Sequence, residues 1–324
     1  MPLATDKLNA VKIVVSHASC ADGLASAIFC KNALPHVEVR FIQYDTPEHL
    51  ELEPEPGMLF CDFSPHPSRY KEFIEAGALI LDHHKTAQPI VEAFGENGVF
   101  GDELFQPGVC GAVLAFHEVW LPLQDNRYEC SLARELAYLT GIRDTWQRQS
   151  PDWKKACILS ETLRFFPEEG WLTIAGSKPI FSREFCDWWD YRRAVGQILV
   201  ERLERDVEKA VEGAHRFTTP FGTRVVLFPG ARYSSDAAEA LHDEADLVVG
   251  FEYIGVDSNE LATLSFSTRS HTDFNCGQFC KSKGGGGHTQ AAGFAVKFEP
   301  GKTFYDPYSE FQRLLSEYEQ ALKG

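Results

Sequence analysis

Four short apolar runs, separated by segments with helical spacing, fill the first quarter of the chain. The runs are VKIVVS (11–16), VEVRFIQY (37–44), MLFCDF (58–63) and ALILDH (78–83), and their β-branched and apolar residues are typical of buried strands. Because most of these runs are apolar nearly throughout, both faces of the sheet are expected to be covered by helices. The alternation of strands and helices predicts an α/β fold whose N-terminal sheet is mostly parallel and flanked by helices.

The second half of the chain indicates a further domain. Helical periodicity extends from Arg183 to Ala214, and strand-like runs return at 223–230, 245–255, 261–269 and 293–299 before a last helical segment. A chain of 324 residues also exceeds what one hydrophobic core ordinarily organises. We predict an N-terminal domain at 1–183, a helical connector at 184–214 and a smaller C-terminal α/β domain at 215–324, facing the first across a cleft.

The charge of the chain limits the classes of molecule that it is expected to bind. The formal net charge is −16, and both predicted domains are acidic. A protein that follows long DNA or RNA presents a basic stripe to the phosphates, and the sequence has none. It also has no apolar stretch long enough to span a membrane and no secretory signal, while its nine cysteines are scattered without zinc-like spacing. We expect a cytoplasmic protein that binds neither long nucleic acid nor a membrane.

Residues able to bind metal ions follow three of the apolar runs. They are His17, Cys20 and Asp22 after the first, Asp62 after the third, and Asp82, His83 and His84 after the fourth. In open parallel sheets, ligands gather beyond the carboxyl ends of the strands, so these side chains are expected to share one site. Asp144, in TGIRDTW at the end of a helix-rich stretch, is a further candidate.

Carboxylate and imidazole groups in this mixture suit Mn²⁺, Mg²⁺ or another first-row divalent ion. Two such ions about 3.5–4 Å apart act together on a water molecule and a phosphoryl oxygen, and Asp62 is our candidate for the bridging carboxylate. A lone aspartate at a strand end is more often a helix cap or a turn former. Two adjacent histidines after an aspartate are harder to explain in that way. In an extended strand their side chains point in opposite directions, so one histidine can bind metal while the other faces the substrate.

A run of four glycines marks the C-terminal part of the chain. It lies in KSKGGGGHTQAAGF (281–294), after the strand-like LSFSTRS (264–270). Glycines permit positive φ and close approach to a ligand, and successive amides cradle an anion. The small residues after the run allow a helix to start or to pack tightly. A flexible linker is the alternative, although a linker is not expected to lead into a histidine and a packing element. The predicted substrate-binding residues are Arg269, Gly286, Gly287 and His288.

Together these residues resemble the DHH phosphoesterase superfamily with its associated C-terminal domain. The namesake motif is LDHHKTA, and the C-terminal signature is GGGGHTQAAGF. The other family motifs are the DG-x-x-S segment (Asp22, Gly23 and Ser26), the aspartate in CDFSP and the aspartate in GIRDTW. All five motifs occur in family order between about residue 11 and residue 297. The resemblance implies a binuclear centre, usually of manganese, in the N-terminal domain, over which the C-terminal domain closes.

The resemblance also assigns roles by position. The implied metal ligands are Asp22, Asp62, His83 and Asp144, with His17 as a further one. Asp82 would orient ligands or water without binding metal directly, and His84 would contact the scissile phosphate or help proton transfer. Arg269 and His288 would bind the terminal phosphate or the base of the substrate.

One position departs from the family pattern. Many members have an Asp-x-Asp pair in the first motif, whereas this chain has Cys20-Ala21-Asp22. Three outcomes are open at this position: the thiolate of Cys20 binds the metal ion, a water molecule fills the place of the missing carboxylate, or that metal ion binds weakly. A softer ligand would favour Mn²⁺, Fe²⁺ or Zn²⁺ over Mg²⁺.

Within the superfamily, the acidity of the chain and its lack of room for a further nucleic-acid-binding domain favour short substrates. We expect a metal-dependent phosphodiesterase that hydrolyses linear dinucleotides or very short oligonucleotides to mononucleotides, with aromatic residues such as Trp146 or Phe266 available to stack on bases. One alternative is a phosphatase acting on 3′-phosphoadenosine phosphate or polyphosphate. Another is a catalytically weakened nucleotide sensor, which the cysteine at position 20 favours. The sequence is also compatible with a homodimer.

Overall fold

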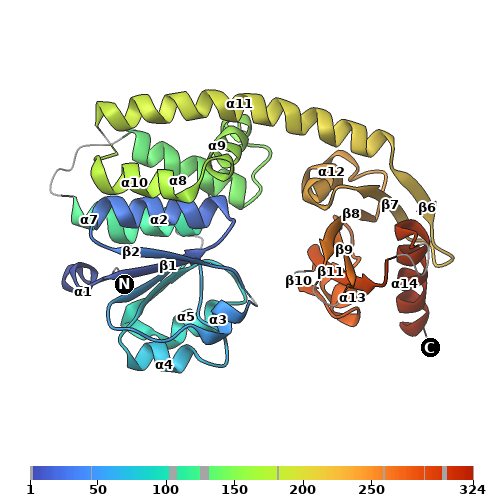
Figure 1. The fold of residues 1–324 in the computed structure, drawn as a ribbon, viewed down its shortest axis with the longest axis horizontal. Helices are drawn as coiled ribbons and strands as arrows, with labels where there is room; N and C mark the ends of the chain where they lie inside the picture. Colours follow the sequence, from blue (N-terminus) through green and yellow to red (C-terminus); the bar gives the residue numbers. More distant parts are fainter. Residues whose placement is uncertain are drawn as a thin grey trace. The chain divides into compact units, whose positions relative to one another are not determined.

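Two β-sheets, one in each half of the chain, organise the protein (Figure 1). The computed structural model describes residues 3–44, 46–101, 108–124, 131–180, 182–257, 260–287, 289–300 and 305–323. The chain divides into two compact units, Met1–Glu201 and Arg202–Gly324. The boundary between them lies inside one long helix, α11 (Arg183–Glu212).

The N-terminal unit contains a five-stranded sheet of order β2-β1-β3-β4-β5, in which all neighbouring strands are parallel. Its strands are β1 (Ile13–His17), β2 (Glu38–Ile42), β3 (Met58–Cys61), β4 (Leu79–Asp82) and β5 (Gly98–Phe100). Its helices are α1 (Thr5–Asn9), α2 (Ala21–Ala33), α3 (Pro47–Glu51), α4 (Tyr70–Glu75), α5 (Gln88–Ala93), α6 (Gly111–Ala115), α7 (Leu121–Leu123), α8 (Ser131–Asp144), α9 (Trp153–Phe165) and α10 (Glu168–Ser177). A 3₁₀ turn, η1 (Gly95–Asn97), precedes β5, and a π-helical turn, η2 (Phe116–Trp120), joins α6 to α7.

Helices cover both faces of this sheet because its strands are apolar on both sides. Val14 and Leu59 belong to the core that contains α2, α6 and α8, whereas their strand neighbours Val15 and Phe60 belong to the core that contains α4 and α5. Figure 1 shows α2, α8 and α10 on one side of the sheet and α3, α4 and α5 on the other. The predicted α/β class with a parallel N-terminal sheet is confirmed.

The C-terminal unit contains a mixed six-stranded sheet of order β10-β11-β9-β8-β7-β6, in which only β7 and β8 are parallel neighbours. Its strands are β6 (His215–Thr218), β7 (Arg224–Pro229), β8 (Leu247–Val256), β9 (Ala262–Arg269), β10 (Gly286–Gly287) and β11 (Ala291–Phe298). Its helices are the 3₁₀ turn η3 (Ala231–Tyr233), α12 (Ser234–Ala240), α13 (Cys276–Ser282) and α14 (Pro307–Ala321), together with the end of α11. One face of the sheet packs on α13 and α14, and the other packs on α12 and α11.

Three strands are absent from the sequence-based prediction. β5, β6 and β10 are two to four residues long, and none of them is a continuous apolar run that would distinguish it from a loop. The small residues at 291–293 begin strand β11 rather than a helix, since they pair with Gly286, Gly287 and the end of β9. Among the described residues, no helix is both long enough and apolar enough to cross a membrane.

Candidate metal centre

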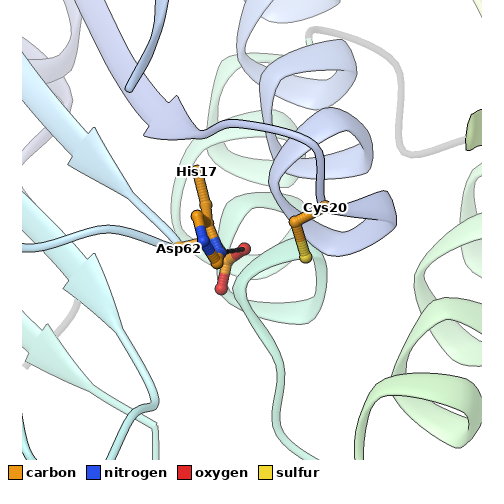
Figure 2. A group of neighbouring side chains, drawn as sticks. All are labelled: His17, Cys20 and Asp62. Atoms are coloured by element: carbon orange, nitrogen blue, oxygen red, sulfur yellow. Dashed lines mark ion pairs between the residues drawn. The ribbon is translucent and has the colours of Figure 1, made fainter. Parts of the chain in front are cut away.

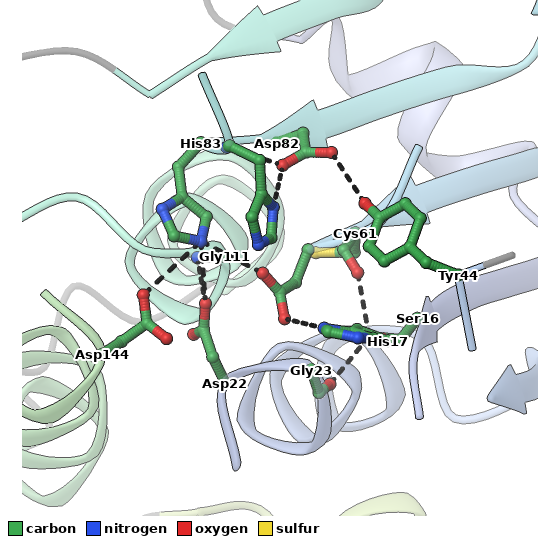
Figure 3. Close-up of polar contacts among 12 residues, drawn as sticks. Ser16, His17, Asp22, Gly23, Tyr44, Cys61, Asp82, His83, Gly111 and Asp144 are labelled. Atoms are coloured by element: carbon green, nitrogen blue, oxygen red, sulfur yellow. Dashed lines mark hydrogen bonds and ion pairs between the residues drawn. The ribbon is translucent and has the colours of Figure 1, made fainter. Parts of the chain in front are cut away.

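The polar residues that follow the parallel strands meet at one edge of the N-terminal sheet (Figure 3). His17 ends β1, Asp62 directly follows β3, and Asp82 ends β4. These three strands are consecutive neighbours in the sheet, so their carboxyl ends lie side by side. Two helices complete the site, because α2 contributes Asp22 from its first turn and α8 contributes Asp144 as its last residue.

The imidazole of His83 lies among three carboxylates (Figure 3). Its Nε2 is 3.2 Å from Asp62 Oδ1, 3.5 Å from Asp22 Oδ2 and 3.5 Å from Asp144 Oδ2. A single ring N–H cannot serve three acceptors, and two of these distances are too long for a strong hydrogen bond. The three carboxylates are therefore gathered around one imidazole that cannot donate to all of them.

A second group of donor atoms lies beside the first (Figure 2). It consists of His17, Cys20 and Asp62, whose ligand atoms all lie within 4.8 Å of one another. His17 Nδ1 and Asp62 Oδ2 are 3.8 Å apart, and both atoms are buried without a hydrogen-bond partner. Asp62 also forms a group with His83 and His84. Its two oxygens thus face two different sets of ligands, which is the geometry that a bridging carboxylate needs.

The donor atoms of these residues are better satisfied by divalent cations than by contacts with one another. A buried polar atom without a partner costs about 1–3 kcal/mol, and Asp62 Oδ2 and His17 Nδ1 are two such atoms. Burial and the negative charge of Asp22 raise the pKa of Asp62 well above its usual value, and the same two causes raise the pKa of Asp144 to about 6. A bound cation relieves both the desolvation and the repulsion.

Cys20 belongs to this second group but differs in its chemistry. It stands at the N-terminal cap of α2. Burial, together with the negative charges of Asp22 and Asp144, raises the pKa of the thiol to about 11. Without a cation beside it the thiol stays protonated, and metal binding there requires that the proton is displaced.

Two backbone N–H groups that sequence reasoning missed hold the carboxylate of Asp22 in place. The N–H of Gly111 donates to Asp22 Oδ2 at 2.6 Å, and the N–H of Ala112 donates to Asp22 Oδ1 at 2.7 Å. A Cβ atom on Gly111 would lie 2.3 Å from Asp62 Cβ, so only glycine fits there. Asp62 itself has a φ of 57°, a conformation that is uncommon outside glycine and is often found at functional sites. No sequence signal identifies Gly111, since it lies 89 residues from its partner Asp22.

Asp82 contacts His84 rather than the metal-binding groups. Asp82 Oδ1 accepts from the His84 ring at Nδ1 (2.7 Å) and from the His84 backbone N–H (2.9 Å). Its Oδ2 accepts from Ser64 Oγ at 2.5 Å and lies 3.5 Å from the Tyr44 hydroxyl, which in turn accepts the N–H of Ser64. Sequence reasoning missed Ser64 and Tyr44, whose contacts arise only when β2, β3 and β4 are assembled.

The contact between Asp82 and His84 shifts the pKa of both residues. Burial acts to raise the pKa of Asp82, but the hydrogen bond from His84 and its positive charge outweigh burial and hold that pKa below its usual value. Burial acts to lower the pKa of His84, but the hydrogen bond to Asp82 and its negative charge outweigh burial and raise it. Each group therefore favours the charged form of the other.

The predicted substrate-binding residues lie in the C-terminal unit. Arg269 ends β9, and its guanidinium donates to Ser235 Oγ (2.9 Å), the Thr268 carbonyl (2.8 Å) and Ser267 Oγ (3.1 Å). All of these acceptors are neutral, and across the described parts of the chain Arg269 forms no ion pair. Burial lowers its pKa. The side chain is thus a half-buried cation whose hydrogen bonds, among the described residues, all go to neutral acceptors.

The glycine run lies on the edge of the same sheet as Arg269. Gly286 and Gly287 form β10, which pairs with β11 opposite Gly293 and Ala292. Gly287 has a φ of 135°, while a Cβ atom on Gly286 would meet no atom within 4 Å. His288, the remaining predicted contact, lies outside the described residues.

Solved structures that share this fold cover nearly the whole chain. They include the pGpG-specific phosphodiesterase PggH of Vibrio cholerae (11% identity, 96% of this chain and 99% of that chain, TM-score 0.55), the DHH domain of a member of a family of ribosomal proteins (12%, 98% and 87%, 0.60) and the exonuclease RecJ bound to manganese (16%, 98% and 95%, 0.57). Neither a protein-family model nor a curated protein sequence matches the chain. The chain therefore has the fold of the DHH phosphoesterases that its motifs resemble.

Proposed function

We propose that the protein is a metal-dependent phosphodiesterase that hydrolyses linear dinucleotides or very short oligonucleotides to mononucleotides. The observation that carries the proposal is the position of Asp62. One of its oxygens lies beside His83, and the other faces an unpaired nitrogen of His17. A carboxylate in this position serves two metal ions, as the cleavage of phosphate esters by paired cations requires.

The proposal assigns two sets of ligands. His17 and Cys20 would hold one ion, Asp22, His83 and Asp144 would hold the other, and Asp62 would contribute to both. Mn²⁺ is the expected metal, since carboxylate and imidazole donors suit it and the RecJ exonuclease that shares the fold was solved with manganese. When bound, the two ions polarise the phosphoryl group and neutralise the negative charge that builds on it during cleavage.

His84 is the proposed proton donor to the departing ribose oxygen. Asp82 fixes the His84 ring by accepting from Nδ1, which leaves Nε2 to transfer the proton. The hydrogen bond from Ser64 keeps Asp82 oriented, and Asp82 in turn holds the ring of His84. In this scheme Asp82 and His84 carry out proton transfer, while the remaining carboxylates hold cations.

A short nucleotide is the substrate that the charges favour. The net charge of −16 disfavours a long polyanion, whereas a local cation such as Arg269 is enough to bind one phosphate. Gly286, Gly287 and His288 are proposed to contact the same end of the substrate. The fold shared with a pGpG-specific phosphodiesterase supports a linear dinucleotide, although that substrate is a property of the other protein.

One observation favours a second candidate, a nucleotide sensor without strong catalysis. Cys20 stands where a carboxylate is frequent, and its pKa is raised to about 11, so the ion that it would share with His17 must displace a proton to bind. If that ion binds weakly, nucleotide binding survives while turnover is lost.

The test measures the release of mononucleotides from 5′-phosphorylated dinucleotides, cyclic dinucleotides and 3′-phosphoadenosine phosphate, each with Mn²⁺. Asp62→Asn is the control variant, because asparagine tolerates the positive φ at this position. We expect mononucleotides from the linear dinucleotides, and no release by the variant.

The other outcomes separate the candidates. Phosphate release from 3′-phosphoadenosine phosphate alone would indicate a phosphatase. Nucleotide binding without turnover at saturating Mn²⁺ would indicate the sensor. Equal activity of the wild-type protein and the Asp62→Asn variant would refute the metal centre itself.

A further inference from the structure

Two tryptophans and two arginines gather directly after Asp144. This tryptophan–arginine cluster consists of Arg143, Trp146, Arg148 and Trp153. The guanidinium carbon of Arg143 lies 4.2 Å from the centroid of the Trp146 ring and 5.2 Å from that of Trp153. The guanidinium carbon of Arg148 lies 5.9 Å and 5.3 Å from the same two centroids. All four distances are within the range of a cation–π interaction, which extends to about 6 Å.

The backbone of the cluster is held in a conformation that disfavours tryptophan. Trp146 has a φ of 57°, just beyond the end of α8, where helices usually place glycine or asparagine. Hydrogen bonds from Trp146 N to the Arg143 carbonyl (3.3 Å) and from Gln147 N to the Ile142 carbonyl (2.9 Å) fix this turn. A bulky residue at such a position costs free energy that glycine would not. The turn itself therefore does not explain the indole ring.

Position connects the cluster to the metal centre. Arg143 and Trp146 flank Asp144, whose carboxylate lies 3.5 Å from the His83 ring. The two indole rings are half-buried and meet edge to face, with centroids 5.2 Å apart. Two partly accessible indole rings with two guanidinium groups beside them thus directly follow the carboxylate of Asp144 along the chain, in a protein whose net charge is −16.

We propose that the tryptophan–arginine cluster binds the base of the nucleotide whose phosphate occupies the metal centre. This inference rests on the proposed function and adds the means of substrate recognition. An indole ring stacks on any nucleobase, because every base has a π face, and the adjacent guanidinium groups attract the phosphate that the base carries. The cluster therefore selects a nucleotide over other phosphate esters and does not distinguish one base from another.

The experiment compares two ligands that differ only by the base. Binding of adenosine 5′-monophosphate and of ribose 5-phosphate to the Mn²⁺-loaded full chain is measured by calorimetry, for the wild-type protein and for Trp146→Gly. Glycine suits the positive φ at position 146, so the variant removes the ring without straining the turn. Trp146→Phe retains an aromatic ring, and Tyr191→Ala removes a ring that is 68% exposed on α11.

We expect Trp146→Gly to weaken binding of adenosine 5′-monophosphate by at least about fivefold, the lower end of base stacking, and to leave ribose 5-phosphate unaffected. Trp146→Phe should retain most of the affinity, and Tyr191→Ala should retain all of it. The proposal is overturned if the wild-type protein binds both ligands equally, or if Trp146→Gly weakens both to the same extent.

Failure of the proposed function has a different signature. A protein that binds adenosine 5′-monophosphate through Trp146 but cleaves no dinucleotide supports base binding and contradicts the phosphodiesterase. A protein that cleaves dinucleotides equally well with tryptophan or glycine at position 146 supports the phosphodiesterase and contradicts base binding.

Discussion

The two units of the chain differ in the sign of the charges that they gather: carboxylates in the N-terminal unit and a guanidinium in the C-terminal unit. In the N-terminal unit, Asp22, Asp62 and Asp144 surround one imidazole, and the pKa values of Asp62 and Asp144 are raised. In the C-terminal unit, the half-buried Arg269 is held by neutral acceptors alone among the described residues. Cations would neutralise the first arrangement and an anion the second, which agrees with the proposed metal ions and phosphate-ester substrate.

The two sites also differ in how tightly they are built. The metal centre consists of side chains at strand ends and helix ends, with backbone atoms packed so closely that Gly111 tolerates no Cβ. The glycine run has open space around Gly286. Precise ligand geometry needs a rigid frame, whereas backbone amides and a single arginine would suffice for the phosphate in the proposed substrate site. Substitutions should therefore have larger effects in the first site than in the second.

The largest effect is expected at Asp62. Asp62→Asn removes one charge from the metal centre and should reduce Mn²⁺-dependent hydrolysis by about a thousandfold or more. The melting temperature of the metal-free protein should stay the same or rise, because the variant loses a buried carboxylate whose charged form is disfavoured in the folded state.

Thermal unfolding with and without Mn²⁺ checks the second part. Mn²⁺ should raise the melting temperature of the wild-type protein and not that of the variant. Asp187→Asn, at a position that is 73% exposed on α11, is the control and should behave as the wild-type protein does. A metal-free variant that melts well below the wild-type protein would mean that Asp62 has a structural role.

A matched pair of glycine substitutions tests the difference in packing. Gly111→Ala places a Cβ atom 2.3 Å from Asp62 Cβ and displaces the N–H that Asp22 accepts. We expect Mn²⁺ affinity to fall by about 10–100-fold and stability by about 1–3 kcal/mol. Gly286→Ala meets no atom and should change neither quantity. Titration calorimetry and thermal unfolding of both variants decide the matter, and similar effects of the two substitutions would contradict the distinction.

The sequence predicted which residues gather at the candidate metal centre better than it predicted the residues that hold them in place. Parallel strands place their carboxyl ends at one edge, so His17, Asp62 and the Asp82–His84 segment were expected together, and the structure brings them together. Asp144 was a candidate from its position at the end of a helix-rich stretch, but only the family resemblance made it a metal ligand, because nothing in a local pattern places the end of α8 beside β4. Ser64 lies two residues after Asp62, but only the assembled sheet shows that its hydroxyl reaches Asp82.

In the C-terminal unit, the local hydrophobic pattern predicted the long strands but not the shortest ones. The long apolar runs became β7, β8, β9 and β11, whose alternating residues pack on two helix layers. β10 consists of two glycines and has no side chain to show periodicity. Its pairing with β11 is set by backbone hydrogen bonds alone, which a hydrophobic pattern does not record.

A smaller effect is expected at Arg269. Arg269→Gln removes the positive charge and should raise the KM for a 5′-phosphorylated dinucleotide about tenfold, since hydrogen bonds to charged groups contribute about 1.5–3 kcal/mol. Mn²⁺ affinity should not change, because Arg269 is not one of the proposed metal ligands. Arg269→Lys keeps the charge but loses the planar fork, so its KM should lie between the two. Steady-state kinetics checks this order, and an unchanged KM in the glutamine variant would remove Arg269 from the substrate site.

The smallest effect is expected at Ser64, which touches neither a metal-binding group nor the proposed substrate residues. Ser64→Ala removes the hydroxyl that donates to Asp82 Oδ2 and leaves that oxygen with the Tyr44 hydroxyl at 3.5 Å. Asp82 then orients His84 less firmly, and kcat should fall by about threefold to tenfold, as expected for one hydrogen bond, while KM and Mn²⁺ affinity stay unchanged.

Ser160→Ala is the matched control for this change. Ser160 is 2% exposed like Ser64 and lies in the same unit, and its hydroxyl has no hydrogen-bond partner within the described part of the chain. Removal of that hydroxyl should therefore leave kcat unchanged and should not lower the melting temperature. Equal losses of kcat in the two variants would show that any buried serine supports the fold to the same degree. A loss confined to Ser64→Ala would show that proton transfer depends on how Asp82 is held, as the contact between Asp82 and His84 predicts.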